Sequence, residues 1–310
     1  MISFRRICSY LNLSILGTIL SINQISKSYS SIEALRNVSF NVPEGSVFGI
    51  LGPNGSGKTT LLGILLDELN ANTGTYEWFG GLPHNAARRQ IGSLLETPNF
   101  YHYLSALDNL KITSAIKQRG EEDREQVLKV VGLYERRNSK FQEFSLGMKQ
   151  RLAIAGALLG GPKVLVLDEP TNGLDPAGIA EIRELIRHLN SQGITIIMAS
   201  HLLDEVEKVC TDVAILKKGD LLLSGPVDEV LRSEDQLELK AGDMLMLQKT
   251  ISEMPGVNKV QLVNGYLQVT CETHVQPYHI NEYCMSRGIV LSHLLLKKKS
   301  LETKFMELTG

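Results

Sequence analysis

A run of nine residues in the first quarter of the chain has the residue types and spacing of a phosphate-binding loop. It reads Gly52-Pro53-Asn54-Gly55-Ser56-Gly57-Lys58-Thr59-Thr60. An apolar run precedes it and a helix-like run follows it, which is the strand–loop–helix context that such a loop needs. The glycines let backbone N–H groups turn inward toward phosphate oxygens, and the following helix presents its positive end to the same anion. A glycine-rich structural turn is the alternative, which the matching context on both sides disfavours.

Four side chains in two stretches have the chemistry of ATP hydrolysis. Lys58 would contact the β- and γ-phosphates, and the hydroxyl of Thr59 would bind Mg²⁺. Asp168 and Glu169 directly follow a fully apolar run at 164–167, typical of a strand buried in a parallel sheet. The first acid can hold Mg²⁺, and the second can orient a water for in-line attack on the γ-phosphate. An acidic pair after a strand often only caps a helix, but the phosphate loop upstream makes hydrolysis the better interpretation.

A histidine follows a further buried strand. Residues 194–199 are almost wholly apolar, and His201 comes just after them. A single histidine is usually structural. Because the carboxyl ends of parallel strands meet at one edge of a sheet, we favour a contact between His201 and the γ-phosphate. The candidate catalytic residues are therefore Lys58, Glu169 and His201.

Shorter patterns predict the elements that position these groups. Residues 21–25 and 38–42 alternate as two strands joined by a turn. Tyr29 lies between them and could stack on an adenine ring, although a lone tyrosine there is more often a packing residue. The apolar run 91–95 ends at Glu96, and a polar residue in this place is common in α/β active sites.

Composition narrows the classes of protein. The chain has 310 residues, 43% of them hydrophobic, and a formal net charge of -2, which gives no general argument for binding nucleic acid or an anionic membrane surface. Four scattered cysteines form no C-x-x-C pair, as expected of a reducing compartment. No run reaches the ~20 apolar residues of a spanning helix. Residues 1–19 resemble a weak signal sequence, but we expect a disordered extension, or a start codon assigned too far upstream, in preference to a membrane-touching segment.

The combination of motifs resembles the ATP-binding subunit of an ABC transporter, and the likeness extends over residues 20–230. Its most specific element is the stretch Phe144-Ser145-Leu146-Gly147-Met148-Lys149-Gln150-Arg151, which is similar to the signature motif that other P-loop ATPases lack. The resemblance implies a role for each matching residue. Tyr29 matches the residue that stacks on adenine, residues 52–60 match the Walker A loop, and Ser145 and Gly147 match the signature motif. Asp168 matches the Walker B acid and Glu169 the catalytic glutamate. Asp175 matches the D-loop and His201 the switch histidine.

Two motifs depart from the family pattern. Glu96 stands where the family usually has a glutamine that ligates Mg²⁺ and couples hydrolysis to the permease. A carboxylate could still ligate Mg²⁺, but it adds negative charge near the triphosphate. Leu146 and Met148 replace the first glycine and the glutamine of the usual signature, whereas Ser145 and Gly147 remain. Both departures look like subunits that export bacitracin or lantibiotic-type peptides.

The resemblance also implies a fold and an assembly. We expect an α/β P-loop NTPase over residues 20–229, with a RecA-like core, an antiparallel β subdomain around Tyr29 and a helical subdomain at about 100–160. Two such domains would meet head to tail, with ATP and Mg²⁺ between one subunit's Walker A loop and the other's Ser145. A homodimer is the simpler assumption. A membrane permease in a separate chain would place the protein in the cytoplasm, peripheral on the inner face of the cell membrane, with no nucleic-acid partner.

Residues 230–310 predict a small accessory α+β domain. The alternating runs 260–263 and 266–270 flank Asn264-Gly265, a strong hairpin signal. Helix-like stretches, two further strands and a final helix at 300–308 complete it. It contains no catalytic constellation, and both a regulatory and a dimer-supporting role stay open.

Three functions compete at this point. The energising subunit of an exporter is the main hypothesis. A soluble ABC ATPase that remodels a macromolecular complex is the alternative, but such proteins usually carry tandem nucleotide domains or coiled-coil insertions, and this chain shows neither. The third is a nucleotide-dependent regulatory module with little turnover. The chain retains the residues expected to hydrolyse ATP, which argues against this function: Lys58, Asp168, Glu169 and His201. The replacement of the usual glutamine by Glu96 leaves it as an alternative.

Overall fold

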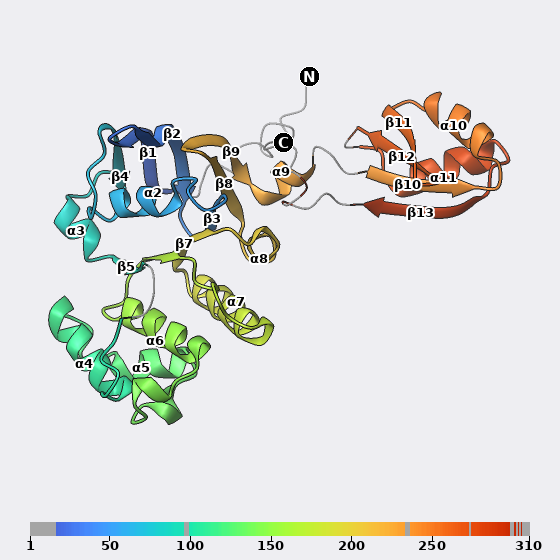
Figure 1. Ribbon diagram of the computed structural model, residues 1–310. Helices are drawn as coiled ribbons and strands as arrows, with labels where there is room; N and C mark the ends of the chain where they lie inside the picture. Colours follow the sequence, from blue (N-terminus) through green and yellow to red (C-terminus); the bar gives the residue numbers. More distant parts are fainter. Residues whose placement is uncertain are drawn as a thin grey trace, which may run out of the picture. The chain divides into compact units, whose positions relative to one another are not determined.

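The computed structural model describes residues 17–95, 99–232, 236–272, 274–297 and, of the final stretch, 301, 303 and 305. Most of the expected N-terminal extension, Glu96 and most of the predicted last helix therefore lie outside the described residues. Internal contacts divide the chain into two units, Met1–Gly225 and Pro226–Gly310 (Figure 1). The boundary drawn from the sequence, at 229/230, falls within α9 (Val227–Arg232).

The first unit is built on a six-stranded sheet with the strand order β5-β6-β7-β3-β8-β9. Neighbours from β5 to β8 pair in parallel, as predicted for an α/β core. Every residue of β3, β6 and β7 is buried, which explains why these strands are mostly apolar and do not alternate. The strands are β3 (Val47–Leu51), β5 (Ile91–Leu94), β6 (Val164–Asp168), β7 (Thr195–Ser200), β8 (Asp212–Lys217) and β9 (Asp220–Pro226).

Helices α2 (Lys58–Leu65), α7 (Pro176–Ser191) and α8 (Leu203–Glu207) belong to the same core. In α7 the side chain of Asp175 caps the first turn and a proline occupies its first position, both common start signals of a helix. Its buried face repeats at helical spacing through Ile182, Leu185, Ile186 and Leu189. The helix α2 is apolar on most sides and correspondingly buried from Leu61 to Leu65.

A second, antiparallel sheet with the order β2-β1-β4 packs against this core. Its strands are β1 (Thr18–Tyr29), β2 (Ile32–Pro43) and β4 (Thr73–Trp78), and α3 (His84–Arg88) follows them. The rings of Phe40 and Phe48 stack at 5.2 Å between centroids and join the two sheets. The indole N–H of Trp78 donates to the Leu65 carbonyl at the end of α2. The antiparallel subdomain predicted around Tyr29 is thus confirmed.

A group of helices lies between β5 and β6 in the chain (Figure 1). It comprises α4 (Ala106–Lys117), α5 (Arg124–Val130), α6 (Leu146–Leu158) and 3₁₀ turns at Tyr134–Arg136 and Phe141–Glu143. The Lys117 ammonium joins α4 to the end of α6 by donating to the carbonyls of Gly156 (2.7 Å) and Ala157 (3.1 Å). A Cβ on Gly92 would lie 2.3 Å from the Ala157 carbonyl oxygen, so β5 needs glycine where α6 ends against it. The predicted helical subdomain is confirmed.

From β10 to β13 the second unit has the element order β-α-β-β-α-β. Its sheet has the order β11-β12-β10-β13, and all three pairings are antiparallel. This is the ferredoxin-like arrangement. Positive φ angles at Asn264 and Gly265 build the tight turn of the predicted hairpin, which is confirmed. The elements are β10 (Gln236–Ala241), α10 (Met244–Ser252), β11 (Val257–Val263), β12 (Tyr266–Cys271), α11 (Pro277–Ser286) and β13 (Leu291–Lys297).

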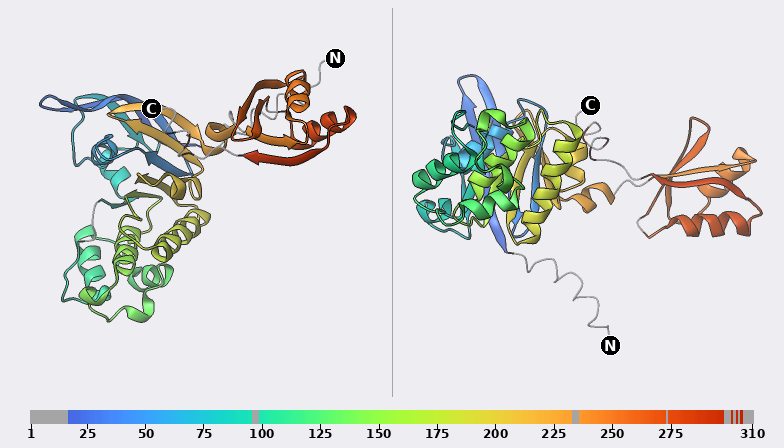
Figure 2. Two further views of the ribbon diagram at one scale, coloured as in Figure 1. Left: turned by 45° about the vertical axis from the view of Figure 1, so that its right-hand side comes forward. Right: turned by 90° about the horizontal axis from the view of Figure 1, so that it is seen from below.

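The helices α10 and α11 cover the same face of this sheet (Figure 2). Alternation in β10 shows which face this is, because Leu237 and Leu239 are buried whereas Lys240 is exposed. Leu247 of α10 and Ile280 of α11 complete the same apolar cluster. In neither unit is any described helix long and apolar enough to cross a membrane.

Lys117 makes the stability of the first unit depend on pH. Burial lowers its pKa from 10.5 to about 8. Below pH 8 the folded chain holds a desolvated cation. Between about pH 8 and 10.5 the folded lysine is neutral while the unfolded one still binds a proton, so its destabilising effect is relieved as pH rises. We therefore expect the free energy of unfolding of wild type to rise by up to about 3 kcal/mol between pH 7 and pH 10 relative to that of Lys117→Met, which has no proton to release. Urea unfolding of both proteins at the two pH values checks this, and a pH-independent difference would contradict it.

Candidate nucleotide-binding and hydrolysis site

The phosphate loop runs from the end of β3 into α2, and contacts with neighbouring backbone fix its shape. Gly52, Gly55 and Gly57 have φ angles of 158°, 77° and 107°. A Cβ on Gly52 would lie 2.3 Å from the Leu216 carbonyl oxygen, and one on Gly57 2.5 Å from that of Ala34. Real side chains do not tolerate such contacts, so the loop requires glycine at both positions. The buried hydroxyl of Ser56 has no hydrogen-bond partner among the described residues, as suits a loop that wraps an anion.

Lys58 connects the loop to the acidic strand end. Its side chain is 5% exposed, and its ammonium donates to the carbonyl oxygens of Gly52 (2.8 Å) and Pro53 (3.3 Å). The same nitrogen lies 3.4 Å from Glu169 Oε1. The cation therefore sits across the mouth of the loop, where it can add charge to the backbone N–H donors.

The first residues of α2 meet the end of β6. Thr59 Oγ1 donates to Asp168 Oδ2 at 2.8 Å, and Asp168 is buried. No group of three or more ligating histidine, cysteine or acidic side chains occurs in the described parts of the chain. One hydroxyl and one carboxylate nevertheless fit Mg²⁺, which usually takes one or two protein oxygens and completes its shell with water and substrate phosphate.

Glu169 is held from two directions. Its backbone has a φ of 49°, an unusual conformation for a residue with a side chain, and its N–H donates to the Ala199 carbonyl of β7. Glu169 Oε2 lies 2.8 Å from Nδ1 of His201. Lys58, Glu169 and His201 thus form a continuous set of contacts at the carboxyl edge of the sheet, where the sequence predicted that these side chains would meet.

Ser145 and Asp175 lie apart from this set. Both are exposed residues that cap helices: Ser145 Oγ accepts from Met148 N–H at the start of α6, and Asp175 Oδ1 from Gly178 N–H at the start of α7. The described hydrogen bonds of both side chains stay within their own helices. Gly147 lies at the contact between the two helix starts, where an added Cβ would lie 3.9 Å from Gly178 Cα.

Tyr29 is the last residue of β1, and its side chain is 44% exposed. The Lys27 ammonium lies 5.2 Å from the centre of its ring. An accessible aromatic face of this kind can stack on a base. Glu96 lies outside the described residues, so its predicted role as a metal ligand stays a prediction.

Sequence reasoning missed the residues that support the loop from behind. The N–H of Gly219 donates to the Ser56 carbonyl at 3.0 Å, and the N–H of Arg36 donates to the Gly219 carbonyl at 2.8 Å. The pattern Lys218-Gly219 between two apolar runs indicates a turn. Nothing in the pattern indicates that this turn contacts the phosphate loop.

Comparison with known proteins agrees with this geometry. The sequence model of the ABC transporter family matches residues 35–172. The lantibiotic transport ATP-binding protein SrtF of Streptococcus pyogenes is 41% identical over 209 residues, which cover 67% of this chain and 91% of SrtF. The bacitracin transport ATP-binding protein BcrA of Bacillus licheniformis is 35% identical over 303 residues, or 95% of this chain and 98% of BcrA. This chain belongs to the family of ABC transporter ATP-binding proteins.

Solved ABC cassettes share the fold. The structure of cbiO1 from Clostridium perfringens, part of the ABC transporter complex cbiONQ, superimposes with a TM-score of 0.63 at 30% identity, covering 77% of this chain and 96% of cbiO1. A dimeric ATP-binding cassette in a post-hydrolysis state, bound to ADP and Pi, superimposes with a TM-score of 0.59 at 29% identity. The match covers 67% of this chain and 98% of that cassette. The chain is thus a nucleotide-binding ABC ATPase that couples ATP hydrolysis to transport.

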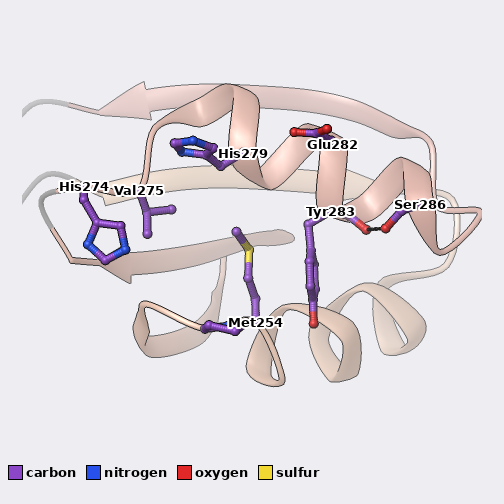
Figure 3. Close-up of a pocket in the computed structure, with 8 residues that line it drawn as sticks. Met254, His274, Val275, His279, Glu282, Tyr283 and Ser286 are labelled. Atoms are coloured by element: carbon purple, nitrogen blue, oxygen red, sulfur yellow. Dashed lines mark hydrogen bonds between the residues drawn. The ribbon is translucent and has the colours of Figure 1, made fainter.

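A hollow of about 520 Å³ lies in the C-terminal unit (Figure 3). It is lined by Met254, Pro255, His274, Val275, His279, Glu282, Tyr283 and Ser286. The Ser286 hydroxyl donates to the Tyr283 carbonyl, and Nδ1 of His279 accepts from the Gln276 N–H, so neither takes part in a nucleophile–base pair. The hydrolytic chemistry belongs to the phosphate loop.

Two glycines of the loop offer a matched test of its packing. A Cβ on Gly57 would collide with the Ala34 carbonyl, whereas one on Gly55 meets nothing within 4 Å. Both have positive φ, so alanine at either position costs about 1–2 kcal/mol of backbone strain. We expect Gly57→Ala to weaken ATP binding more than tenfold beyond Gly55→Ala. Calorimetric titration with ATP and the unfolding midpoint of each variant measure this, and equal losses would show that the Ala34 contact does not shape the loop.

Proposed function

We propose that this chain hydrolyses ATP in composite sites formed with a second copy, and that it drives a separate permease that exports peptide antibiotics or similar compounds. The observation that carries the hydrolytic part is the contact series Lys58–Glu169–His201 at the mouth of the phosphate loop. The relatives named for lantibiotic and bacitracin transport support the transport part.

Each residue has a distinct role in this proposal. The loop N–H groups and Lys58 bind the β- and γ-phosphates of ATP. Glu169, whose Oε2 is held by His201, accepts the proton of the attacking water as the water aligns with the γ-phosphate. Thr59 and Asp168 would hold Mg²⁺, which neutralises charge on the phosphates. Tyr29 stacks on adenine.

The second copy supplies the residues that one chain leaves exposed. Ser145 caps α6 (Leu146–Leu158), whose N-terminal N–H groups and positive dipole end suit a γ-phosphate approaching from outside. Gly147, in the first turn of α6, and Asp175, at the start of α7, extend the same surface. The dimeric cassette bound to ADP and Pi supports this arrangement, and one phosphate loop per chain makes a homodimer the simpler form.

The proposal also fixes location and domain roles. A subunit that feeds ATP energy to a permease works in the cytoplasm, peripheral on the inner face of the membrane. Residues 20–229 form the nucleotide domain, and residues 230–310 form an accessory domain. BcrA, which is named for bacitracin transport, matches 95% of this chain and supports the peptide-export branch.

Mixing two inactive variants tests the composite site. Lys58→Ala removes the phosphate-binding cation, and Ser145→Asn removes the signature hydroxyl while keeping a good helix cap. Each variant alone should lose at least about 99% of ATPase activity. A mixed dimer has one intact site, so an equimolar mixture should recover about a quarter of wild-type activity. Steady-state phosphate release measures this. No recovery above the separate variants would show that ATP is held within one chain.

Capture of the partner tests the transport part. Glu169→Gln should bind ATP but lose hydrolysis by about 10²–10³-fold, which keeps the dimer and its partner closed around the nucleotide. We expect a polytopic membrane protein to co-purify from mild detergent with ATP and Mg²⁺. Lys58→Ala, which should not bind ATP tightly, is the control. Recovery of ribosomal or DNA-associated proteins instead would favour the soluble remodelling ATPase.

The captured complex also allows a test of which compounds are transported. After reconstitution of the wild-type complex in lipid vesicles, cyclic or thioether-bridged antibiotic peptides should stimulate ATPase activity several-fold. Linear peptides of equal length and charge are the matched control. Equal stimulation by both sets would contradict the assignment to antibiotic peptides.

A further inference from the structure

The turn between β8 and β9 joins the phosphate loop to strand β2. Gly219 makes this link with both of its backbone groups. Its N–H donates to the Ser56 carbonyl at 3.0 Å, and its carbonyl accepts from the Arg36 N–H at 2.8 Å. One peptide unit on either side of Gly219 therefore connects two elements that are remote in the sequence.

Close contacts around Gly219 leave its backbone little room to move. The Ala34 carbonyl oxygen of β2 would lie 2.9 Å from a Cβ on Gly219 and 2.5 Å from a Cβ on Gly57. Gly219 has a φ of +88° and Gly57 one of +107°. The turn and the loop thus approach the same carbonyl more closely than any side chain permits, and β2, the turn and the loop form one packed unit.

The Arg36 guanidinium fixes the turn from outside. Its Nη2 donates to the Lys218 carbonyl at 2.8 Å, and its Nε donates to Asp220 Oδ1 at 2.8 Å. A second contact, from Nη2 to Asp220 Oδ2, completes a bidentate pair. The guanidinium therefore binds the residue on each side of Gly219, and its planar fork sets the orientation of the turn.

Overall stability is a weak explanation for this cluster. The side chains of Arg36 and Asp220 are 41% and 49% exposed, and ion pairs at such exposure contribute little to the free energy of unfolding. A geometric role fits better, because the contacts converge on backbone groups that touch the phosphate loop.

The hairpin that carries Arg36 also carries Tyr29. In the β1–β2 pairing Tyr29 faces Ile32 and Ser28 faces Glu33, so Arg36 lies a few residues along the same hairpin arm. ATP has its base at one end and its phosphates at the other. A protein that holds both ends needs a fixed distance between the stacking ring and the phosphate loop.

We propose that Arg36 is a positioning residue that sets the spacing between the Tyr29 ring and the phosphate loop, and so makes the site selective for nucleoside triphosphates over bare polyphosphate. The inference rests on the proposed function in one respect, namely that Tyr29 and the loop bind the two ends of ATP. Arg36 governs ATP affinity through this spacing and leaves the hydrolytic step to Glu169 and its neighbours.

The test compares two ligands that differ in the base. ATP needs both the ring and the loop, whereas inorganic triphosphate needs only the loop. Binding of each, with Mg²⁺, is measured by calorimetry on the full chain for wild type, Arg36→Ala, Arg36→Lys and Asp220→Asn. Arg187→Ala is the matched control, because Arg187 is 47% exposed and also binds a carboxylate, of Glu184, and a backbone carbonyl, of Lys208.

We expect Arg36→Ala to weaken ATP binding about tenfold, within the range of losing one base stack, and to change triphosphate binding by less than about twofold. The KM for ATP should rise by a similar factor while kcat stays within about twofold. Arg36→Lys and Asp220→Asn should be intermediate, because the first removes the planar fork and the second removes the carboxylate charge that pairs with it. Arg187→Ala should change neither ligand. Retained triphosphate binding also shows that the variants are folded.

Equal losses for both ligands in Arg36→Ala would overturn the proposal, because they would mean that the loop itself had deformed. Unchanged binding of both would overturn it as well. Tyr29→Ala separates these results from a failure of the proposed function. It should weaken ATP and spare triphosphate, and if it does not, the adenine site is assigned wrongly and the spacing role falls with it. If Tyr29→Ala weakens ATP binding only, an equal loss of ATP and triphosphate binding in Arg36→Ala contradicts the role of Arg36 and leaves the adenine site in place.

Discussion

The close approach of neighbouring carbonyls to the glycines of the phosphate loop is the constraint on which the site depends. Ala34 of β2 and Leu216 of β8 occupy the space that a Cβ on Gly57 or Gly52 would need. The loop is therefore pressed between two sheets and can curl in one way only. Lys58 follows from that shape, since its ammonium binds the Gly52 and Pro53 carbonyls and is thereby directed at Glu169. The same ammonium lies 3.4 Å from Glu169 Oε1, so the cation and the acid meet beside the loop.

The parallel sheet supplies the opposite wall of the site. β6 and β7 are neighbours, so the residues at their carboxyl ends, Asp168, Glu169 and His201, lie side by side. Glu169 is held in the left-handed region by its N–H bond to Ala199, an uncommon conformation that aims its carboxylate at His201. Strain of this kind persists only where the surrounding structure over-determines it, and here two buried strands do so.

In the proposed composite site, the helical subdomain supplies its signature residues from an exposed surface. Gly92 and Lys117 fasten the end of α6 to β5 and α4, while Ser145 at its start stays exposed. A single helix thus connects the sheet, at one end, with the surface that we assign to the second copy, at the other.

Short stretches of sequence were sufficient to predict the residues of the candidate site. The nine-residue loop, the acids after 164–167 and the Asn264-Gly265 hairpin each follow from rules that act over a few residues, namely glycine φ freedom, buried strand ends and tight-turn geometry. Tertiary structure alone decided that Arg36 binds Asp220, 184 residues away, and that β13 pairs with β10 at the edge of the C-terminal sheet. It also decided the left-handed backbone of Glu169. These features depend on which distant surfaces pack together, and hydrophobic burial, which drives that packing, is not directional enough to be read from one strand or turn.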